Sequence, residues 1–393
     1  METTRIKDST RDRYHALSIS SVWKLEVIRK AASLVVGAGA LGNEVTKNLA
    51  MMGVRLIVIV DRDTVEMANL SRSAFFRESD HGRRKPDVLM ERLLELNPDV
   101  KILPLNGDIE EVIGLGLIRR MDMIFSCLDN RLARRTINRM CQKVAKPWVD
   151  GSMENLIGDV TAYLPDQGPC YECGLTRTDK EIIAQAVSCK GIAIQNLALG
   201  KIPTTSTMGS VIAALQVQEA VKVLHGDIKK SLAGKKLVVN CIINDFYTTQ
   251  IERRHDCDGH FRYGDIIEMP EWTSERTSAH DILAHFQADI GEQGHLRLGR
   301  EIVIGLRCER CAIEEKLGEP LRLLDIERAK CPQCGEVREP KTTHIITGKE
   351  AYAAWPIKRL GIPILDILEV RSGGGYRWYE ITGDLKILPD GIL

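Results

Sequence analysis

The sequence lacks an excess of charge of either sign and lacks a long apolar segment. Lys and Arg together number 54, as do Asp and Glu, so the formal net charge at pH 7 is +0. Neutralising phosphates requires a positive stripe, so we expect no nucleic-acid partner and no membrane surface. No apolar run approaches the ~20 residues that span a bilayer, and the start, METTRIKDSTRDRYH, has no signal-peptide core. We therefore expect a soluble, cytoplasmic protein.

The sequence also lacks the character of a disulfide framework, because such frameworks belong to short secreted chains. Six of its eleven cysteines instead form three C-x-x-C pairs, namely Cys170/Cys173, Cys308/Cys311 and Cys331/Cys334. In a reducing compartment this spacing is typical of metal thiolates, and zinc is the first expectation. The last two pairs together have the spacing of a four-cysteine zinc ribbon, which is structural because four thiolates leave no position for substrate.

The length of 393 residues exceeds the roughly 250–300 at which single cores stop growing, so we expect two domains. Apolar runs predict strands over 33–40, 55–61, 121–129 and 236–245, and helical patterns lie between them or over 210–226. This alternation predicts an α/β, Rossmann-like, doubly wound and mostly parallel sheet. The segment 159–165 interrupts this alternation of strands and helices and indicates some antiparallel structure.

The pattern of predicted strands and helices changes after about residue 262, so we divide the chain into domains 1–265 and 266–393. The second is expected to be a smaller α+β domain that contains zinc. A capped helix is predicted within 273–290, a strand within 300–311, and a hairpin around Gly373–Gly375.

Gly37-Ala38-Gly39-Ala40-Leu41-Gly42 is a G-x-G-x-x-G turn between a predicted strand and a predicted helix. Such glycines let a phosphate approach the backbone and the helix N-terminus, where N–H groups favour an anion. Asp61 ends the next strand, where an acid holds ribose hydroxyls. Alone, the pattern also fits a dinucleotide enzyme or a tight turn without a ligand.

The residues after Asp61 favour a nucleoside triphosphate over a dinucleotide. Two cations, Arg72 and Lys85, follow it, and they suit a triphosphate whose α-phosphate is attacked while charge spreads onto pyrophosphate. Asp129 ends the following strand at the same sheet edge, where an acid can hold Mg²⁺ against phosphates. Taken singly, the two cations are also typical of a solvated surface.

At this point the chain resembles the ThiF and ubiquitin-activating superfamily, whose members adenylate the C-terminal glycine of a ubiquitin-like or sulfur-carrier protein. The resemblance spans about residues 13–260 and rests on GAGALG, DRDTVEMANLSR, the Lys85 segment, NPDV, CLDNRLARRTIN, GDVTAYLP and CYEC. It implies that ATP and Mg²⁺ are bound by Gly37, Gly39, Gly42, Asp61, Asp63, Asn69, Arg72, Lys85, Asp129 and Asn130. Where the family often has Gln, this chain has Ser73, which puts the role of that position in doubt.

The resemblance further implies an arginine finger that reaches the γ-phosphate in a partner subunit's site. Arg13 stands about where the family carries it, and Arg11 is the alternative. A chain with both the nucleotide site and the finger is expected to form a homodimer. The other interpretation of this segment is a polar tail.

In the family a second cysteine pair follows the last strand of the domain and completes a zinc site with the first pair. Here that region reads RRHDCDGH, so Cys257 and His260 are expected to join Cys170 and Cys173, with His255 as the alternative fourth ligand. A redox C-x-x-C is the competing interpretation of the first pair. Its context lacks the helix N-terminus that lowers a thiol pKa.

Cys189 matches the position of the thioester cysteine in ubiquitin-activating members, and Lys190 beside it favours the thiolate. The first hypothesis is therefore adenylation followed by a thioester on Cys189, for transfer to a conjugating enzyme that a ubiquitin-fold C-terminal domain would recruit. The second is a sulfur-carrier adenylyltransferase without thioester transfer, and Cys189 is then an ordinary loop cysteine. A non-catalytic partner subunit is disfavoured by the intact set of nucleotide-site residues.

Overall fold

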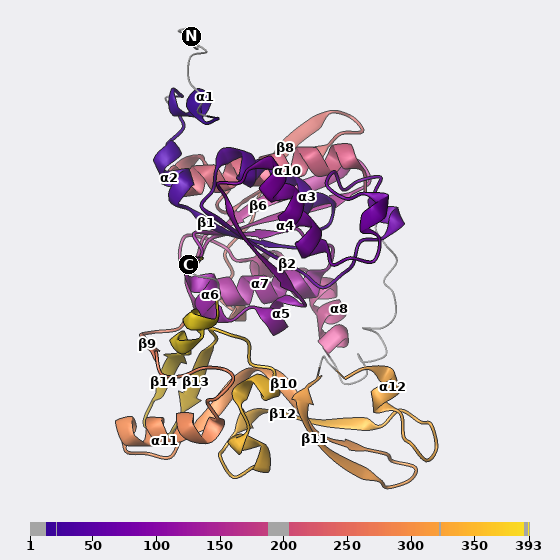
Figure 1. The fold of residues 1–393 in the computed structure, drawn as a ribbon, viewed down its shortest axis with the longest axis vertical. Helices are drawn as coiled ribbons and strands as arrows, with labels where there is room; N and C mark the ends of the chain where they lie inside the picture. The colour runs from indigo at the N-terminus through magenta and orange to yellow at the C-terminus, as the bar shows by residue number, and fades with distance from the viewer. Residues whose placement is uncertain (1–12, 21, 188–203, 322–323, 389–391, 393) are drawn as a thin grey trace.

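The computed structural model describes residues 13–20, 22–187, 204–321, 324–388 and 392, which form two sheets (Figure 1). The first sheet has the strand order β3-β2-β1-β4-β5-β6-β7-β8. Its strands are β1 (Ala32–Val36), β2 (Leu56–Asp61), β3 (Lys101–Asn106), β4 (Met123–Ser126), β5 (Trp148–Glu154), β6 (Ile157–Tyr163), β7 (Lys235–Asn240) and β8 (Asp245–Gln250). Neighbours from β3 to β5 are all parallel, so the predicted α/β class with a mostly parallel sheet is confirmed.

Helices pack on both faces of this sheet (Figure 1). One face carries α3 (Ala40–Met52), α4 (Lys85–Leu96) and α10 (Ser206–Leu224), and the other carries α5 (Ile109–Val112), α6 (Leu115–Arg119) and α7 (Arg131–Lys143). The central strands are buried on both sides, and this explains their unbroken apolar sequence. Outside these layers lie α1 (His15–Ser18), α2 (Leu25–Lys30) and α8 (Arg177–Val187).

The far end of the first sheet is antiparallel, from β5 through β6 and β7 to β8. The antiparallel structure predicted around 159–165 is therefore confirmed. The strand predicted over 236–245 is wrong beyond Asn240, where β7 ends. The Asn240 side chain accepts a hydrogen bond from the Ile242 N–H (3.0 Å) and Asn244 is left-handed (φ 57°), so the chain turns and returns as β8. Cys241, expected inside a strand, lies in this turn.

The second sheet has the order β11-β10-β13-β14-β9, and β12 also pairs with β10. Its elements are β9 (Ile266–Glu268), α11 (Ala279–Ile290), β10 (His295–Arg307), β11 (Glu314–Pro320), α12 (Ile326–Ala329), β12 (Glu339–Ile346), β13 (Ile367–Arg371) and β14 (Tyr376–Glu380). The β13–β14 pair is the hairpin predicted around Gly373–Gly375. Ser278 caps α11 by accepting a hydrogen bond from the Asp281 N–H, as the sequence predicts.

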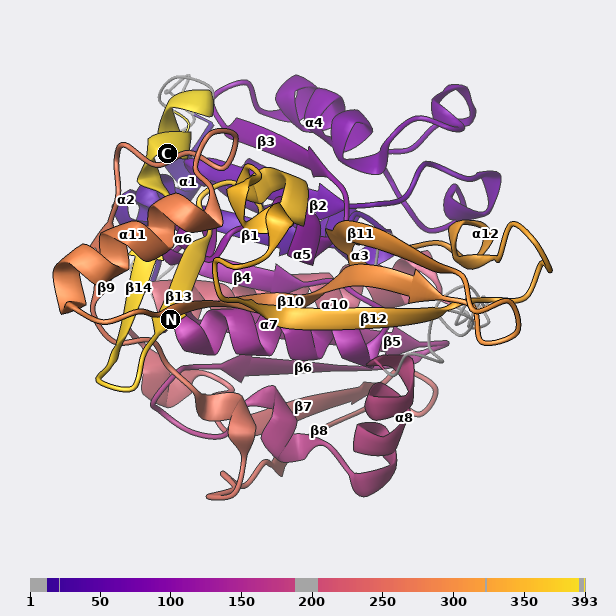
Figure 2. The same ribbon diagram turned by 90° about the horizontal axis from the view of Figure 1, so that it is seen from below.

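The second sheet lies against the α5–α7 face of the first, as Figure 2 shows from below. We call the first sheet with its helices the first unit and the second sheet with its helices the second unit. Glu380 of the second unit is fully buried between the guanidinium groups of Arg119 and Arg120 of the first unit. The Gly116 N–H donates to the Leu365 carbonyl (2.8 Å), and a Cβ on Gly114 would lie 2.2 Å from the Ile364 oxygen. The two units therefore meet along a close, charged contact. Among the described residues, no helix has the length and apolarity to cross a membrane.

Candidate active site

The glycine turn connects β1 to α3 at the carboxyl edge of the parallel strands. Gly37 is left-handed (φ +99°), and a Cβ there would lie 2.5 Å from the Cys127 carbonyl oxygen. A Cβ on Gly42 would lie 1.9 Å from the Gly37 oxygen. A Cβ on Gly39, by contrast, would meet no atom of the described residues within 4 Å. Two glycines thus permit close backbone packing, and Gly39 leaves open space at the N-terminus of α3, where an anion is favoured.

Asp61, the last residue of β2, joins that strand to the glycine turn. Its carboxylate accepts hydrogen bonds from the Ala38 N–H (2.6 Å) and the Asp63 N–H (2.8 Å). Burial raises the pKa of Asp61, although the Lys85 charge and these two N–H groups oppose the rise. The side chain therefore fixes the loop on one side of the open space at Gly39.

A cation and an acid face each other beside Asp61. Lys85, the first residue of α4, is buried, and its Nζ lies 2.9 Å from Oδ2 of the half-exposed Asp63. A backbone hydrogen bond joins the same two residues, from the Lys85 N–H to the Asp63 carbonyl (3.2 Å). The ammonium group is thus held at the strand edge, close to Asp61.

The segment after β2 contains the other predicted phosphate ligands. Asn69 is buried, and its Oδ1 accepts the Glu66 N–H (2.9 Å), which caps the short helical turn Met67–Asn69. Arg72 donates to the Ala68 carbonyl (2.8 Å) and is partly exposed. Ser73 is buried, and within the described chain its hydroxyl has no hydrogen-bond partner.

Asp129 and Asn130 follow β4, which pairs directly with β1. Asp129 is exposed. Asn130 is the N-cap of α7, and its Oδ1 accepts the Ala133 N–H (2.7 Å). Because β1, β2 and β4 are adjacent and parallel, the glycine turn, Asp61 and Asp129 all stand at one sheet edge. An exposed carboxylate there has the hard oxygen donors that Mg²⁺ takes.

A buried ion pair behind Asp129 was not anticipated from the sequence. Arg134 of α7 lies 3.1 Å from Asp150, the last residue of β5 that pairs with β4, and it donates to the Leu128 carbonyl at 2.6 Å. Burial raises the pKa of Asp150, and the Arg134 charge opposes this. The pair holds the peptide that precedes Asp129. Arg134 stands in the CLDNRLARRTIN run, but nothing local in the sequence connects it to Asp150.

Arg13, another predicted catalytic residue, lies away from this edge. Arg13 donates from Nη1 to the carbonyl of Leu96 (3.1 Å), the last residue of α4. Since α4 starts at Lys85 and its 12 residues rise about 1.5 Å each, Arg13 is at the other end of a helix of about 18 Å. Arg13 therefore does not reach the nucleotide edge of its own chain. Cys189 and Arg11 lie outside the described residues.

The first cysteine set comes together between the crossover segment and the end of the first unit. Cys170 Sγ lies 3.9 Å from Cys173 Sγ and 3.7 Å from Cys257 Sγ, and Cys173 Sγ lies 3.1 Å from His260 Nε2. The fourth member is thus His260 and not His255. Three thiols and an imidazole are a donor set that fits tetrahedral zinc.

The first set is also tied to α7. Glu172, between the two cysteines of the pair, is hydrogen-bonded by Arg139 (2.8 Å) and Arg135 (3.1 Å). Burial opposes ionisation of Glu172, but these guanidinium groups outweigh it and lower its pKa. A Cβ on Gly259 would lie 2.9 Å from Cys170 Sγ, so the two chain segments pack without room for a side chain.

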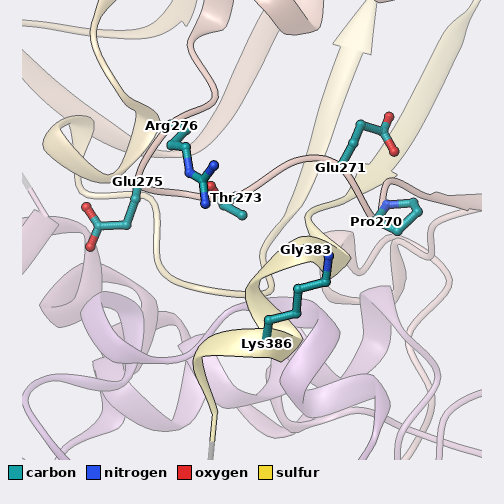
Figure 3. Close-up of a pocket in the computed structure, with 7 residues that line it drawn as sticks. All are labelled: Pro270, Glu271, Thr273, Glu275, Arg276, Gly383 and Lys386. Carbon is teal, nitrogen blue, oxygen red and sulfur yellow. The ribbon is translucent and has the colours of Figure 1, made fainter.

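The second predicted set also converges, in the second sheet. The ligand atoms of Cys308, Cys311, Cys331 and Cys334 all lie within 4.8 Å of one another. A separate small pocket is found between the segment 270–276, which follows β9, and the helical turn Thr382–Ile387 (Figure 3). Its lining residues are Pro270, Glu271, Thr273, Glu275, Arg276, Gly383 and Lys386. Glu271 and Glu275 point in different directions, so their carboxylates do not converge on one ligand.

Comparisons with known proteins identify the family of the chain. The model of the ThiF family matches residues 12–259. The molybdopterin-synthase adenylyltransferase of Escherichia coli (strain K12) is 28% identical over 234 residues, 59% of this chain and 88% of that protein. Ubiquitin-like modifier-activating enzyme 5 of Dictyostelium discoideum is 28% identical over 250 residues, 60% of this chain and 63% of that one. The chain thus spans most of the first relative and less than two thirds of the second.

The solved structures support the fold. The crystal structure of E. coli MccB with succinimide has a TM-score of 0.52 at 21% identity, over 64% of this chain and 75% of that chain. At this level of identity the likeness shows the shared fold alone.

Proposed function

The chain belongs to the ThiF family, and we propose that it is an adenylyltransferase that activates the C-terminal glycine of a ubiquitin-like or sulfur-carrier protein with ATP. The observation that carries the proposal is the convergence at one sheet edge of open space at Gly39, the acid Asp61 and the buried Lys85. The relatives named as adenylyltransferases and modifier-activating enzymes support it.

In the proposed reaction, the carboxylate of the target attacks the α-phosphate of ATP, and an acyl-adenylate and pyrophosphate result. The N-terminus of α3 at Gly39 would receive phosphate oxygens, and Asp61 would hold the ribose hydroxyls. Asp63, Asn69, Arg72 and Lys85 would line the triphosphate. The cations Arg72 and Lys85 would offset the negative charge that moves onto pyrophosphate, and Asp63 would hold the Lys85 ammonium group in place. Asp129, beside Asn130, would hold Mg²⁺, which shields the phosphate charge when bound.

We further propose that the active form is a homodimer in which Arg13 serves the partner's site. Its place at the far end of α4 supports action in trans, since it cannot serve its own edge. The set Cys170, Cys173, Cys257 and His260 would hold one structural Zn²⁺. Thiols that bind metal must stay reduced, which supports a cytoplasmic location.

The activated carbonyl has two candidate fates. In the first, Cys189 attacks it, AMP leaves, and the thioester is passed to a conjugating enzyme; the relative named as a modifier-activating enzyme supports this. In the second, a sulfur nucleophile from a donor attacks the activated carbonyl and AMP leaves, which gives a thiocarboxylate. The molybdopterin-synthase relative favours the second fate, because the chain spans 88% of it.

One experiment separates adenylation from the thioester. The purified chain is incubated with Mg-ATP and a β-grasp protein that ends in Gly-Gly, the products are run on non-reducing gels, and released pyrophosphate is measured. An ATP-dependent band that thiol reagents remove, absent in Cys189→Ala, would support the first fate. Pyrophosphate release without that band would support the second, and neither pyrophosphate nor a band with any such protein would contradict adenylation.

A further inference from the structure

The four cysteines of the second set stand on two turns of the same shape. The first turn follows β10, where the Cys308 N–H donates to the Ile313 carbonyl (2.9 Å) and Ala312 is left-handed (φ 52°). In the second turn, after α12, the Cys331 N–H donates to the Glu336 carbonyl (2.7 Å). Gly335 is left-handed there (φ 73°). Each turn therefore closes between a cysteine and the fifth residue after it, with a left-handed residue at the fourth.

In this conformation the Sγ atoms of both cysteines in each turn face the same point. The ligand atoms of all four lie within 4.8 Å of one another, and Cys308 Sγ lies 3.6 Å from Cys334 Sγ of the other turn. A tetrahedron of thiolates about 2.3 Å from zinc has edges of about 3.8 Å. The Cys311 N–H also donates a hydrogen bond to Cys308 Sγ (3.4 Å). The sulfur atoms are thus spaced as a metal would hold them.

The described part of the segment around the two turns buries few apolar side chains. We call β11, α12 and β12, together with the C-terminal half of β10, the arm. Among its described residues, the buried apolar cluster consists of Val303, Leu306, Leu324 and Ala329. Small units with so few buried side chains often depend on a disulfide or a metal. A bound metal would therefore add free energy to the strand pairing that joins the arm to the second sheet.

Polar contacts of Arg338 hold the second cysteine turn in place. Arg338 is buried, and its guanidinium donates to the carbonyls of Ala329 (3.2 Å) and Arg328 (2.9 Å). Its Nη1 also lies 2.7 Å from Glu315 on β11. The residues next to Cys331 are thus held in place by groups outside the cluster, as is usual around metal ligands.

We propose that Cys308, Cys311, Cys331 and Cys334 bind one Zn²⁺ that holds the arm together. The site is closed, since four thiolates fill a tetrahedral ion, so its role is structural. Binding replaces the thiol protons, which are released to solvent. Iron is the other ion that four thiolates commonly hold, and two disulfides are the metal-free alternative. The proposal does not depend on what the nucleotide edge activates.

The test is the metal content of the 393-residue chain, purified under reducing conditions without chelator and measured by elemental mass spectrometry. We expect two zinc ions per chain, one of them at the first set. The double variant Cys308→Ser/Cys331→Ser should hold one zinc ion, and the matched control Cys241→Ser, whose cysteine belongs to neither set, should hold two. Equal zinc in the double variant and the control would overturn the proposal, as would iron in place of zinc.

A second measurement covers the case in which the double variant does not fold. Zinc-edge X-ray absorption of the unmodified chain should give sulfur at about 2.3 Å as the main ligand. With one zinc bound by four sulfurs and one by three sulfurs and a nitrogen, the mean should be about 3.5 sulfurs per zinc. A mean of three sulfurs, or intact-mass evidence that these cysteines form disulfides in the chain as purified, would contradict the proposal.

Discussion

The nucleotide edge and the arm differ in how much apolar surface surrounds them. The glycine turn, Asp61 and Asp129 end strands that are buried on both faces, between α3, α4 and α10 on one side and α5, α6 and α7 on the other. In the described part of the arm, the buried apolar cluster has four residues, and the two cysteine turns lie beside it. A large core can position polar groups within hydrogen-bond distance by packing alone, whereas the arm depends on a bound ion. Substitutions in the two regions should therefore differ in their effects on activity and on stability.

The largest effect is expected at the nucleotide edge, from Asp129→Ala. If the exposed carboxylate holds Mg²⁺ against the phosphates, its loss should lower the rate of adenylation by about 10²- to 10³-fold, as when other groups that stabilise developing charge are removed. Stability should hardly change, because Asp129 is exposed. Pyrophosphate release measures the rate, and Cys189→Ala is the control that should keep it. Adenylation by Asp129→Ala within twofold of the unmodified chain would contradict this assignment.

The contact between the α5–α7 face of the first sheet and the second sheet should weaken when Glu380 is replaced. Glu380→Ala leaves Arg119 and Arg120 facing an empty buried position and should lower the free energy of unfolding by about 3 kcal/mol. Glu268→Ala is the matched control, since its half-exposed carboxylate pairs with Arg119 at 2.7 Å at a surface where pairs contribute about 0–1 kcal/mol. Denaturant unfolding checks both. Equal losses in the two variants would mean that burial of Glu380 does not matter.

The glycine turn offers a pair of substitutions of the same size with different outcomes. Gly42→Ala places a Cβ 1.9 Å from the Gly37 oxygen and should cost about 1–3 kcal/mol of stability. Gly39→Ala places it in open space, so stability should be kept while ATP binding weakens. Thermal melts with and without ATP separate the two. If Gly39→Ala binds ATP as well as the unmodified chain, the phosphate does not lie where we propose.

The smallest effect on activity is expected from the arm. Cys308→Ser/Cys331→Ser should expose the arm to protease while adenylation stays within about twofold, because the first unit has its own core. Limited proteolysis with mass mapping and pyrophosphate release give the two readouts. A large loss of adenylation in this variant, with the first unit still folded, would show that the arm takes part in the reaction.

The sequence predicted features that local patterns determine. Strand and helix alternation, the glycine turn and the α11 cap are read over a few residues, and the structure contains all of them. The convergence of the two cysteine sets was also predicted, because C-x-x-C spacing and chain order limit the choices. Only the structure could choose His260 over His255, since both are close to Cys257 in the chain.

Contacts between distant residues were not predictable from one sequence. Arg134 with Asp150, and Glu380 with two arginines of α6 and its C-cap, depend on which elements pack together, and no local signal reports this. The strand predicted to 245 is wrong because an Asn side chain ends β7 by a local hydrogen bond within an apolar run. The segment with Cys189 is outside the described residues, so its role stays a prediction.

The most direct test of the proposed adenylation is ATP–pyrophosphate exchange by the 393-residue chain. Sulfur-carrier and ubiquitin-like proteins that end in Gly-Gly are supplied with Mg-ATP and labelled pyrophosphate, each as the free acid and with an amidated C-terminus. We predict exchange with at least one free acid, none with its amide, and loss in Asp129→Ala. Exchange that is equal for acid and amide, or absent with every free acid while the chain is folded, would contradict adenylation of a C-terminal carboxylate.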